Sequence, residues 1–248
     1  MKNEVKLPDA VVKTKNVFKI ASKKLLIMTD MHCPYHCKES IEKAIKIGKK
    51  NKVDTVLLNG DSIDFHVVSR FRKKPDAPNL KFEIDTTISV LKYIRKSFPK
   101  AKILFKLGNH ELRLSHWLQE HPELYSLDCL NIESLLQFKE LKIQKIEEET
   151  IMQAGKLYIA HGSEISCGGV MPARSVMNKY HCNIAFGHLH YYDNWRVKQF
   201  DGSDVQAFSI GALCQLNPDY CPNNNWSNGC MVVEISGNGD FKADNIRF

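Results

Sequence analysis

The chain has 248 residues, of which 43% are hydrophobic and 25% are charged, and this ordinary globular composition excludes a disordered or collagen-like protein. The length fits one large domain, or one domain with an insertion, and is sufficient to bury a substantial core. The formal net charge of +7 favours encounter with anionic substrates, but it is weak support for nucleic-acid binding because the lysines are spread along the sequence.

The sequence indicates neither export nor a membrane partner. Charges interrupt residues 1–20 every few positions, so this stretch has no apolar core of signal-peptide length. No stretch reaches the roughly 18 apolar residues of a membrane helix. We therefore expect a cytoplasmic protein, in the host cytoplasm if a phage encodes it. The eight cysteines show no C-x-x-C spacing, which favours reduced, mostly buried thiols over disulfides or a zinc ribbon.

The first half of the chain predicts alternating strands and helices. Short apolar runs favour buried strands, and apolar residues at helical spacing favour amphipathic helices. Strands at this separation pair in parallel through right-handed crossovers. Because ligands of such sheets bind beyond the carboxyl ends of the strands, we expect Asp30, Asp61 and Asn109 at one edge. The predicted strands are 24–30, 53–59 and 102–107, and the predicted helices are 40–50 and 82–98.

The pattern changes in the second half of the chain. Residues 111–139 are rich in Leu, Glu and His, and they predict a helical, cap-like insertion in a single domain that spans 1–248. Strands predominate after it, apart from a helix around 171–180 and a loop at 217–229 that is rich in asparagine. The predicted strands are 142–146, 150–153, 156–160, 183–186, 195–200, 205–210 and 231–235.

Five short polar motifs stand in order along the chain, each at the end of a predicted strand. Carboxylates and imidazoles together suit borderline metals such as Mn²⁺, Fe²⁺ and Zn²⁺. Each motif alone is a weak signal, because Asp and Asn are also common helix N-caps. All five in this order are hard to obtain by chance. The motifs are Asp30-Met-His32, Gly60-Asp61-Ser-Ile-Asp64, Gly108-Asn109-His110-Glu111, His161-Gly162 and Gly187-His188-Leu-His190.

This set of motifs resembles the calcineurin-like metallophosphoesterase superfamily, whose pattern is D-x-H, GD-x-x-D, GNH[DE], H and GH-x-H. The match runs from Asp30 to His190 and is similar to the compact bacterial and phage-encoded phosphoesterases. The resemblance implies an α/β fold with two mixed β-sheets packed as a sandwich and flanked by helices. In that fold, the first half of the chain would supply the parallel crossovers. The strand-rich second half would supply the second sheet and the histidines.

The resemblance also implies two divalent metal ions, with Mn²⁺ expected first and Fe, Zn, Ni or Mg as alternatives. Asp61 would bridge the two ions, because a carboxylate offers two oxygens. A hydroxide that bridges the metals would attack phosphorus in line with the leaving oxygen. One ion would be held by Asp30, His32, Asp61 and His190, and the other by Asp61, Asn109, His161 and His188.

Further residues acquire roles by the same resemblance. His110 would hydrogen-bond the phosphate or protonate the leaving group, and Asp64 would orient its ring. Asn109 would belong to this catalytic group as well as to the metal ligands, whereas Glu111 is expected to be structural. The candidate substrate contacts, each with a solvated surface position as its alternative, are His66, Arg113 and Arg174.

The expected substrate is a phosphodiester, in a nucleic acid or a nucleotide. Protein Ser/Thr phosphatases of the superfamily carry arginines at two positions where this chain has Phe65 and Leu107, and their loss favours a less charged substrate. The alternatives are a phosphomonoesterase acting on a protein or small molecule, and a noncatalytic binding module on the same fold. Aromatic side chains that would contact nucleic acid, and that are equally compatible with core packing, are Phe65, Trp117 and Tyr191.

Overall fold

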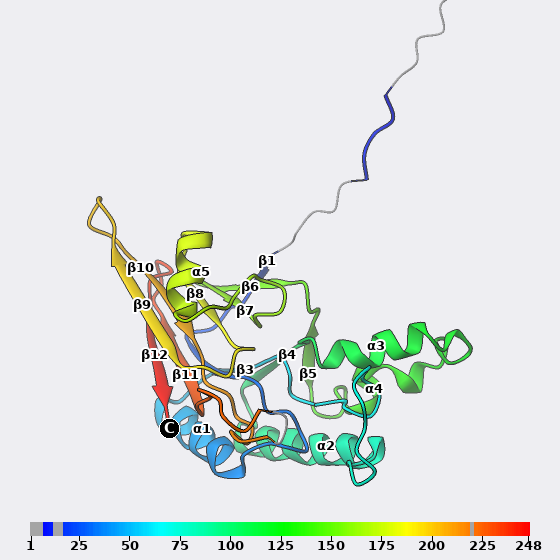
Figure 1. The fold of residues 1–248 in the computed structure, drawn as a ribbon. Helices are drawn as coiled ribbons and strands as arrows, with labels where there is room; N and C mark the ends of the chain where they lie inside the picture. Colours follow the sequence, from blue (N-terminus) through cyan, green and yellow to red (C-terminus); the bar gives the residue numbers. More distant parts are fainter. Residues whose placement is uncertain (1–6, 12–16, 219–220) are drawn as a thin grey trace, which may run out of the picture.

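The computed structural model describes residues 7–11, 17–218 and 221–248 (Figure 1). In this part of the chain, two mixed sheets of six strands each are flanked by helices, as the sequence predicts. The first sheet has the order β12 (Phe241–Arg247), β11 (Gly229–Ile235), β2 (Lys24–Met28), β3 (Thr55–Asn59), β4 (Lys102–Lys106) and β5 (Ile143–Ile146). The second has the order β1 (Val17–Lys19), β6 (Ile151–Ala154), β7 (Leu157–Ala160), β8 (Ile184–Phe186), β10 (Asp204–Ser209) and β9 (Asp193–Lys198).

Three of the helices cover the outer faces of the sheets. The first sheet is covered by α1 (Lys38–Asn51) and α2 (Leu80–Ser97), and α5 (Pro172–Tyr180) packs on β9 and β10 of the second (Figure 1). Helix α2 begins after Asn79, whose side-chain oxygen accepts the backbone N–H of Phe82 at 2.9 Å. The three helices were predicted with their ends correct to within two residues, since apolar spacing defines a helix better than its terminal turns.

The hydrophobic core is divided among the layers of the fold. Leu26 of β2 packs with side chains of α1 and α2, whereas its neighbours Leu25 and Ile27 pack between the sheets. Successive strand side chains point to opposite faces, so a strand buried on both faces reads as a continuous apolar run. A third apolar cluster joins α5 to the second sheet. The double burial of β2, β3 and β4 gives their carboxyl ends a rigid support.

The division of strands between the sheets differs from the prediction. The sequence predicts that the strand-rich second half of the chain builds the second sheet. Instead, β5, β11 and β12 join the first sheet, and β1 joins the second. By pairing antiparallel with β2, β11 covers an edge that the buried strands would otherwise expose. Neither β1 nor β12 was predicted as a strand, because their sequences show little local apolar pattern.

The segment predicted as a helical insertion consists of short helices. It contains α3 (Glu111–Gln119), 3-10 turns at Pro122–Leu124 and Asp128–Leu130, and α4 (Ile132–Leu135). Figure 1 places these helices together beyond β5, on the side of the molecule away from α1. Pro122 stands just after α3, where a proline lacks the N–H that would continue the helix. The function of the segment as a cap in a single domain remains a prediction.

Residues 1–6 and 12–16, which belong to the N-terminal stretch that was expected to lack a signal peptide, lie outside the described residues. No helix within the described ranges is long and apolar enough to span a bilayer. All eight cysteines are free thiols, and Cys33, Cys214 and Cys230 are buried. Burial raises the pKa of each of these three thiols, which makes them less reactive than exposed ones.

A buried carboxylate on α2 makes stability depend on pH. Oε1 of Glu83 accepts the backbone N–H of His66 at 3.1 Å, and Oε2 has no hydrogen-bond partner among the described residues. Burial, reinforced by the charge of Asp64, raises the pKa of Glu83 from 4.5 to about 7. The folded state therefore binds this proton more tightly than the unfolded state. Consequently, the Glu83 contribution to the free energy of unfolding falls as the pH rises from 4.5 to about 7.

We expect Glu83→Gln to remove this contribution. A pKa difference of this size corresponds to at most about 3 kcal/mol. When the pH is raised from 5 to 8, the stability of the variant relative to the wild type should therefore increase by about 2–3 kcal/mol. Urea unfolding of both proteins in the same chelator measures the difference, with the exposed Glu42→Gln on α1 as the control. A difference that stays constant with pH would contradict the prediction.

Candidate metal centre

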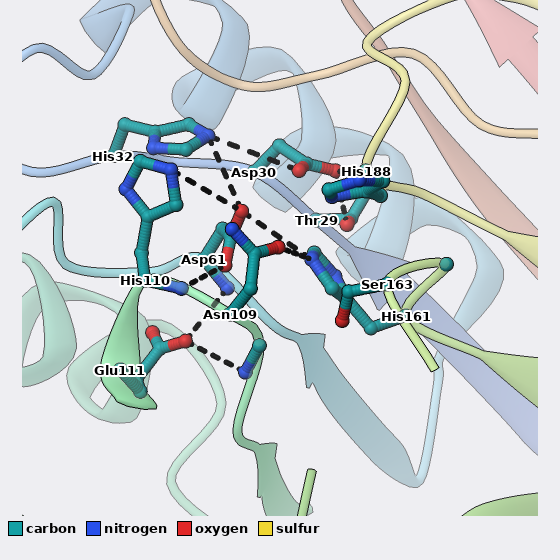
Figure 2. A network of polar contacts seen from close by, with 12 residues as sticks. Thr29, Asp30, His32, Asp61, Asn109, His110, Glu111, His161, Ser163 and His188 are labelled. Carbon is teal, nitrogen blue, oxygen red and sulfur yellow. Dashed lines mark hydrogen bonds and ion pairs between the residues drawn. The ribbon is translucent and has the colours of Figure 1, made fainter. Parts of the chain in front are cut away.

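Seven polar side chains meet where strands of both sheets end, and all of them except His190 are labelled in Figure 2. Strands β2, β3 and β4 are parallel to one another, and β7 is parallel to β8, so each set delivers its carboxyl ends to one edge. The sequence predicted this meeting for the first three strands. The side chains follow their strands as Asp30 and His32 after β2, Asp61 after β3, Asn109 after β4, His161 after β7, and His188 and His190 after β8.

Ligand atoms of Asp30, His32 and His190 converge on one point. Nε2 of His32 lies 3.0 Å from Nε2 of His190, and Oδ1 of Asp30 lies 3.2 Å from the latter atom. The other oxygen of Asp30 accepts the hydroxyl of Thr29 at 2.5 Å and the backbone N–H of His188 at 3.0 Å. Oδ1 is buried and has no hydrogen-bond partner in the described chain, an arrangement that costs about 1–3 kcal/mol or more for a charged group. A divalent cation fits these atoms.

Asp61, Asn109, His161 and His188 form a second group. Nδ1 of His161 lies 2.8 Å from the backbone oxygen of Asn59, so Nδ1 carries the proton. Nε2 lies 3.3 Å from both Oδ2 of Asp61 and Oδ1 of Asn109, and once deprotonated it would offer a lone pair to a cation beside them. Nδ1 of His188 is also buried without a hydrogen-bond partner among the described residues. Several acceptors that face one another in this way fit a second cation.

Asp61 belongs to both groups. Its Oδ1 accepts the backbone N–H of His110 at 2.9 Å. Its Oδ2 lies 3.3 Å from Nε2 of His161 in one group and 3.8 Å from Nε2 of His32 in the other. One carboxylate therefore faces both candidate ion positions, which is the position that the sequence predicts for a bridging ligand.

The carboxylates dominate the electrostatics of the site. Burial by itself lowers the pKa of His161, but the charge of Asp61 outweighs it and raises that pKa to about 10. At His32, burial is likewise outweighed, here by the neighbouring carboxylates of Asp30 and Asp64, and the pKa is about 10. Burial raises the pKa of Asp30 and Asp61, but neighbouring histidines hold both below their ordinary value. Protons thus occupy positions between these acceptors, and a cation would have to displace them.

The site is built on an unusual backbone. Non-glycine residues seldom adopt the left-handed region, at a cost on the order of 1–3 kcal/mol each, and such residues gather at functional sites. Five of the seven residues adopt it, so the chain turns abruptly after β2, β3 and β8. The φ angles are +54° at Asp30, +48° at His32, +52° at Asp61, +67° at His188 and +55° at His190.

Glu111 holds two of the site loops together, in agreement with the structural role expected for it. Oε1 accepts the backbone N–H of Ser62 at 2.7 Å and that of Ile63 at 3.3 Å. Oε2 accepts those of Gly108 at 2.7 Å and Asp61 at 3.0 Å. Burial and the charge of Asp61 raise the pKa of Glu111 to about 7, against the opposing effect of the N–H groups. Gly108 is required beside it, because a Cβ there would collide with Oδ1 of Asp61.

A buried ion pair supports the His161 segment. Glu164 accepts the backbone N–H groups of His161 and Gly162, both at 2.8 Å. Nζ of the fully buried Lys106 lies 3.1 Å from Oε1 of Glu164 and donates to the backbone oxygen of Glu147 at 3.2 Å. Neither member of the pair was predicted from the sequence. Glu164 lies outside the motifs, and a lysine at the end of a strand gives no signal that it is buried.

His110 lies between a carboxylate and a guanidinium. Its Nδ1 is 2.8 Å from Oδ1 of Asp64, and its Nε2 is 2.9 Å from Nη2 of Arg113. Because arginine only donates, Nε2 accepts and Nδ1 carries the proton. Burial lowers the pKa of His110, which favours this neutral ring. Oδ1 of Asp64 also lies 3.2 Å from Nδ1 of His32, so one carboxylate contacts both rings.

A pocket of about 800 Å³ opens beside His110, and two of the three candidate substrate contacts, His66 and Arg113, line it. The third, Arg174, lies on the exposed side of α5, with its guanidinium 5.1 Å from the ring centroid of Trp195. The substrate contacts of all three remain predictions.

The aromatic side chains named from the sequence lie elsewhere. Phe65 is fully buried in the core, and the ring of Trp117 stacks on His121 with centroids 4.0 Å apart. The backbone oxygen of Tyr191, a half-buried residue, accepts the hydroxyl of Ser209 at 2.5 Å. For Phe65, the core-packing alternative is therefore correct.

The fold and this site define a two-sheet α/β protein with a candidate dinuclear metal centre of histidine and aspartate side chains. A comparison with family models gives calcineurin-like phosphoesterase over residues 23–206, a range that includes all five motifs. The chain belongs to the calcineurin-like phosphoesterase family. A comparison with curated proteins found no match.

Several solved structures are similar to the chain at low identity. Yfce, a phosphoesterase from E. coli, is 12% identical with a TM-score of 0.40, covering 90% of this chain and 99% of that one. A dimetal phosphatase from Danio rerio is 10% identical with a TM-score of 0.41, covering 90% and 95%. Vps29 from Chaetomium thermophilum is 10% identical with a TM-score of 0.41, covering 91% and 97%. At these TM-scores, the fold of this chain rests on its own strand order.

Proposed function

We propose that the protein is a phosphodiesterase that acts through two divalent metal ions, with Mn²⁺ expected first. The observation that supports this best is that two groups of ligand atoms share Asp61. Metals bound there would polarise the phosphoryl oxygens and lower the pKa of water at the site. The proposed ligands are Asp30, His32, Asp61 and His190 for one ion, and Asp61, Asn109, His161 and His188 for the other.

The chain's own side chains would bind and orient the phosphate. The guanidinium of Arg113 would meet negative charge on the nonbridging oxygens, because its fork of donors matches them. Asp64 would hold the ring of His110, whose Nε2 can accept a proton at the open side of the site. For His110 to protonate the leaving oxygen, Nε2 must first gain a proton and exchange its contact with Arg113 for the substrate.

The choice of a diester is supported by Phe65 and Leu107, which stand where protein Ser/Thr phosphatases of the superfamily carry arginines. Phe65 and Leu107 are buried apolar side chains, so neither can meet the second negative charge of a terminal phosphate. A phosphomonoesterase is the second candidate, and Arg113 favours it. Its guanidinium lies 2.9 Å from Nε2 of His110, so it brings positive charge to the site from a different position in the sequence than the two missing arginines.

Metal-stripped protein to which Mn²⁺ is restored should hydrolyse bis-p-nitrophenyl phosphate faster than p-nitrophenyl phosphate. A preference for the monoester that disappears in Arg113→Gln would establish the second candidate instead. Absence of turnover with both substrates, in protein shown to contain metal, would count against an enzyme and favour a noncatalytic binding module. The cytoplasmic location, and a nucleic acid or nucleotide as the substrate, also remain proposals.

A further inference from the structure

The pocket beside His110 lies between two loops. One wall is the segment 66–78, which connects β3 to α2, and the lining also contains Gln215, Asn217 and Trp226. The end that meets the candidate metal centre is formed by His32, among other residues. A volume of about 800 Å³ lies within the range of pockets that enclose small ligands. The pocket can therefore hold the group attached to a phosphate bound at the centre.

The charge of the 66–78 segment is concentrated. It carries four basic side chains and the single acid Asp76, a formal charge of +3 with His66 neutral, whereas the whole chain carries +7. Arg72, Lys74 and Arg113 line the pocket, together with the carboxylates of Asp64 and Asp76. The four basic residues are Arg70, Arg72, Lys73 and Lys74.

Three aromatic rings line the same pocket. Tyr35 and Phe71 are 41% and 55% exposed, so much of their apolar surface remains in water. Phe71 lies under the guanidinium of Arg113, with 5.7 Å between Cζ and the ring centroid. Trp226 stands edge-on to the ring of His190, with centroids 4.2 Å apart, and so links the pocket to the candidate metal centre. Flat apolar groups would recover the surface that the exposed rings leave in water.

On the basis of the proposed function, we infer that the substrate is a single-stranded nucleic acid that occupies this pocket. A base stacks on the exposed ring of Phe71, and the phosphates of the strand contact Arg72 and Lys74. Aromatic rings beside a basic wall are the chemistry that binds single strands, because every unpaired base offers a flat face. In a duplex those faces are already stacked. A mononucleotide would satisfy only part of the basic wall.

Binding can be measured without turnover by using a short, fluorescently labelled phosphorothioate oligothymidylate, which resists hydrolysis. Full-length protein with its own metal content is titrated into it, and anisotropy gives the affinity. We expect Phe71→Leu to weaken binding about 5-fold or more, the effect of losing one base–aromatic stack. The double variant Arg72→Gln/Lys74→Gln should also make the affinity less dependent on salt concentration. The expected decrease corresponds to the loss of up to about two phosphate contacts. Lys92→Gln/Lys96→Gln, on the exposed side of α2, removes the same charge away from the pocket and should change the salt dependence less.

Several outcomes would overturn the inference. These are binding that is unchanged in Phe71→Leu and in Arg72→Gln/Lys74→Gln, equal affinity for a duplex of the same sequence, or equal affinity for thymidine monophosphate. Phe71 is exposed, so its variant is expected to fold, and circular dichroism verifies this. Failure of the proposed function would be seen separately, as a lack of p-nitrophenyl diester hydrolysis by the metal-loaded wild type.

Discussion

Asp61→Asn is expected to reduce phosphodiester hydrolysis by a factor on the order of 10³ or more, and to lower the metal content of the purified protein. The reason is that Asp61 faces both ligand groups, with Oδ2 3.3 Å from His161 and 3.8 Å from His32. An amide has no negative charge and cannot share two cations as a carboxylate can. In other enzymes, loss of one donor that stabilises the developing charge lowers the rate by a factor of about 10²–10³. Asp61→Asn would weaken this stabilisation at both ions together.

The substitution is designed to separate chemistry from folding. Asparagine retains an oxygen that can accept the backbone N–H of His110, as Oδ1 of Asp61 does at 2.9 Å. Asp85→Asn, on the exposed side of α2 and outside the five motifs, removes the same charge and serves as the control. Initial rates with bis-p-nitrophenyl phosphate and elemental analysis give the two measurements. If Asp61→Asn retained two ions per chain and a rate within ten-fold of the wild type, Asp61 would not be the shared ligand.

Glu111→Gln is expected to destabilise the protein by about 2–6 kcal/mol. Both carboxylate oxygens of Glu111 accept backbone N–H groups, and an amide nitrogen in place of either one would face two donors. Each buried N–H left without an acceptor costs about 1–3 kcal/mol. Because native domains are stable by only about 5–15 kcal/mol, the loss should be large. It would also loosen Asp61 and Gly108, so activity should fall even where the variant remains folded.

Urea unfolding in a chelator measures the effect on stability without a contribution from bound metal. The matched control is Glu123→Gln, an exposed position in the 3-10 turn after α3, which should change stability by less than about 0.5 kcal/mol. Rates measured below the unfolding transition then report the effect on the site. An unfolding midpoint for Glu111→Gln equal to that of the control would show that the four N–H contacts do not support the loops.

The sequence by itself determined the strands and helices that carry the motifs. An apolar run such as the one before Asp30 indicates a strand that is buried on both faces. The helical spacing of apolar residues in α1 and α2 indicates helices that are buried on one face. It also placed Asp30, Asp61 and Asn109 at one edge, because parallel strands end on the same side. These properties depend on neighbours in the chain, and therefore local sequence is sufficient to reveal them.

Only the tertiary structure decided which strands share a sheet and what supports the site. Pairing of β11 with β2, and of β1 with β6, joins segments far apart in the sequence, and no local pattern reports such contacts. The buried pair of Lys106 and Glu164 depends in the same way on contacts between distant elements. The pocket brings Phe71 and Trp226 together from loops separated by most of the chain. Their side chains became a candidate binding surface because packing of the two sheets fixed both loops at the same edge.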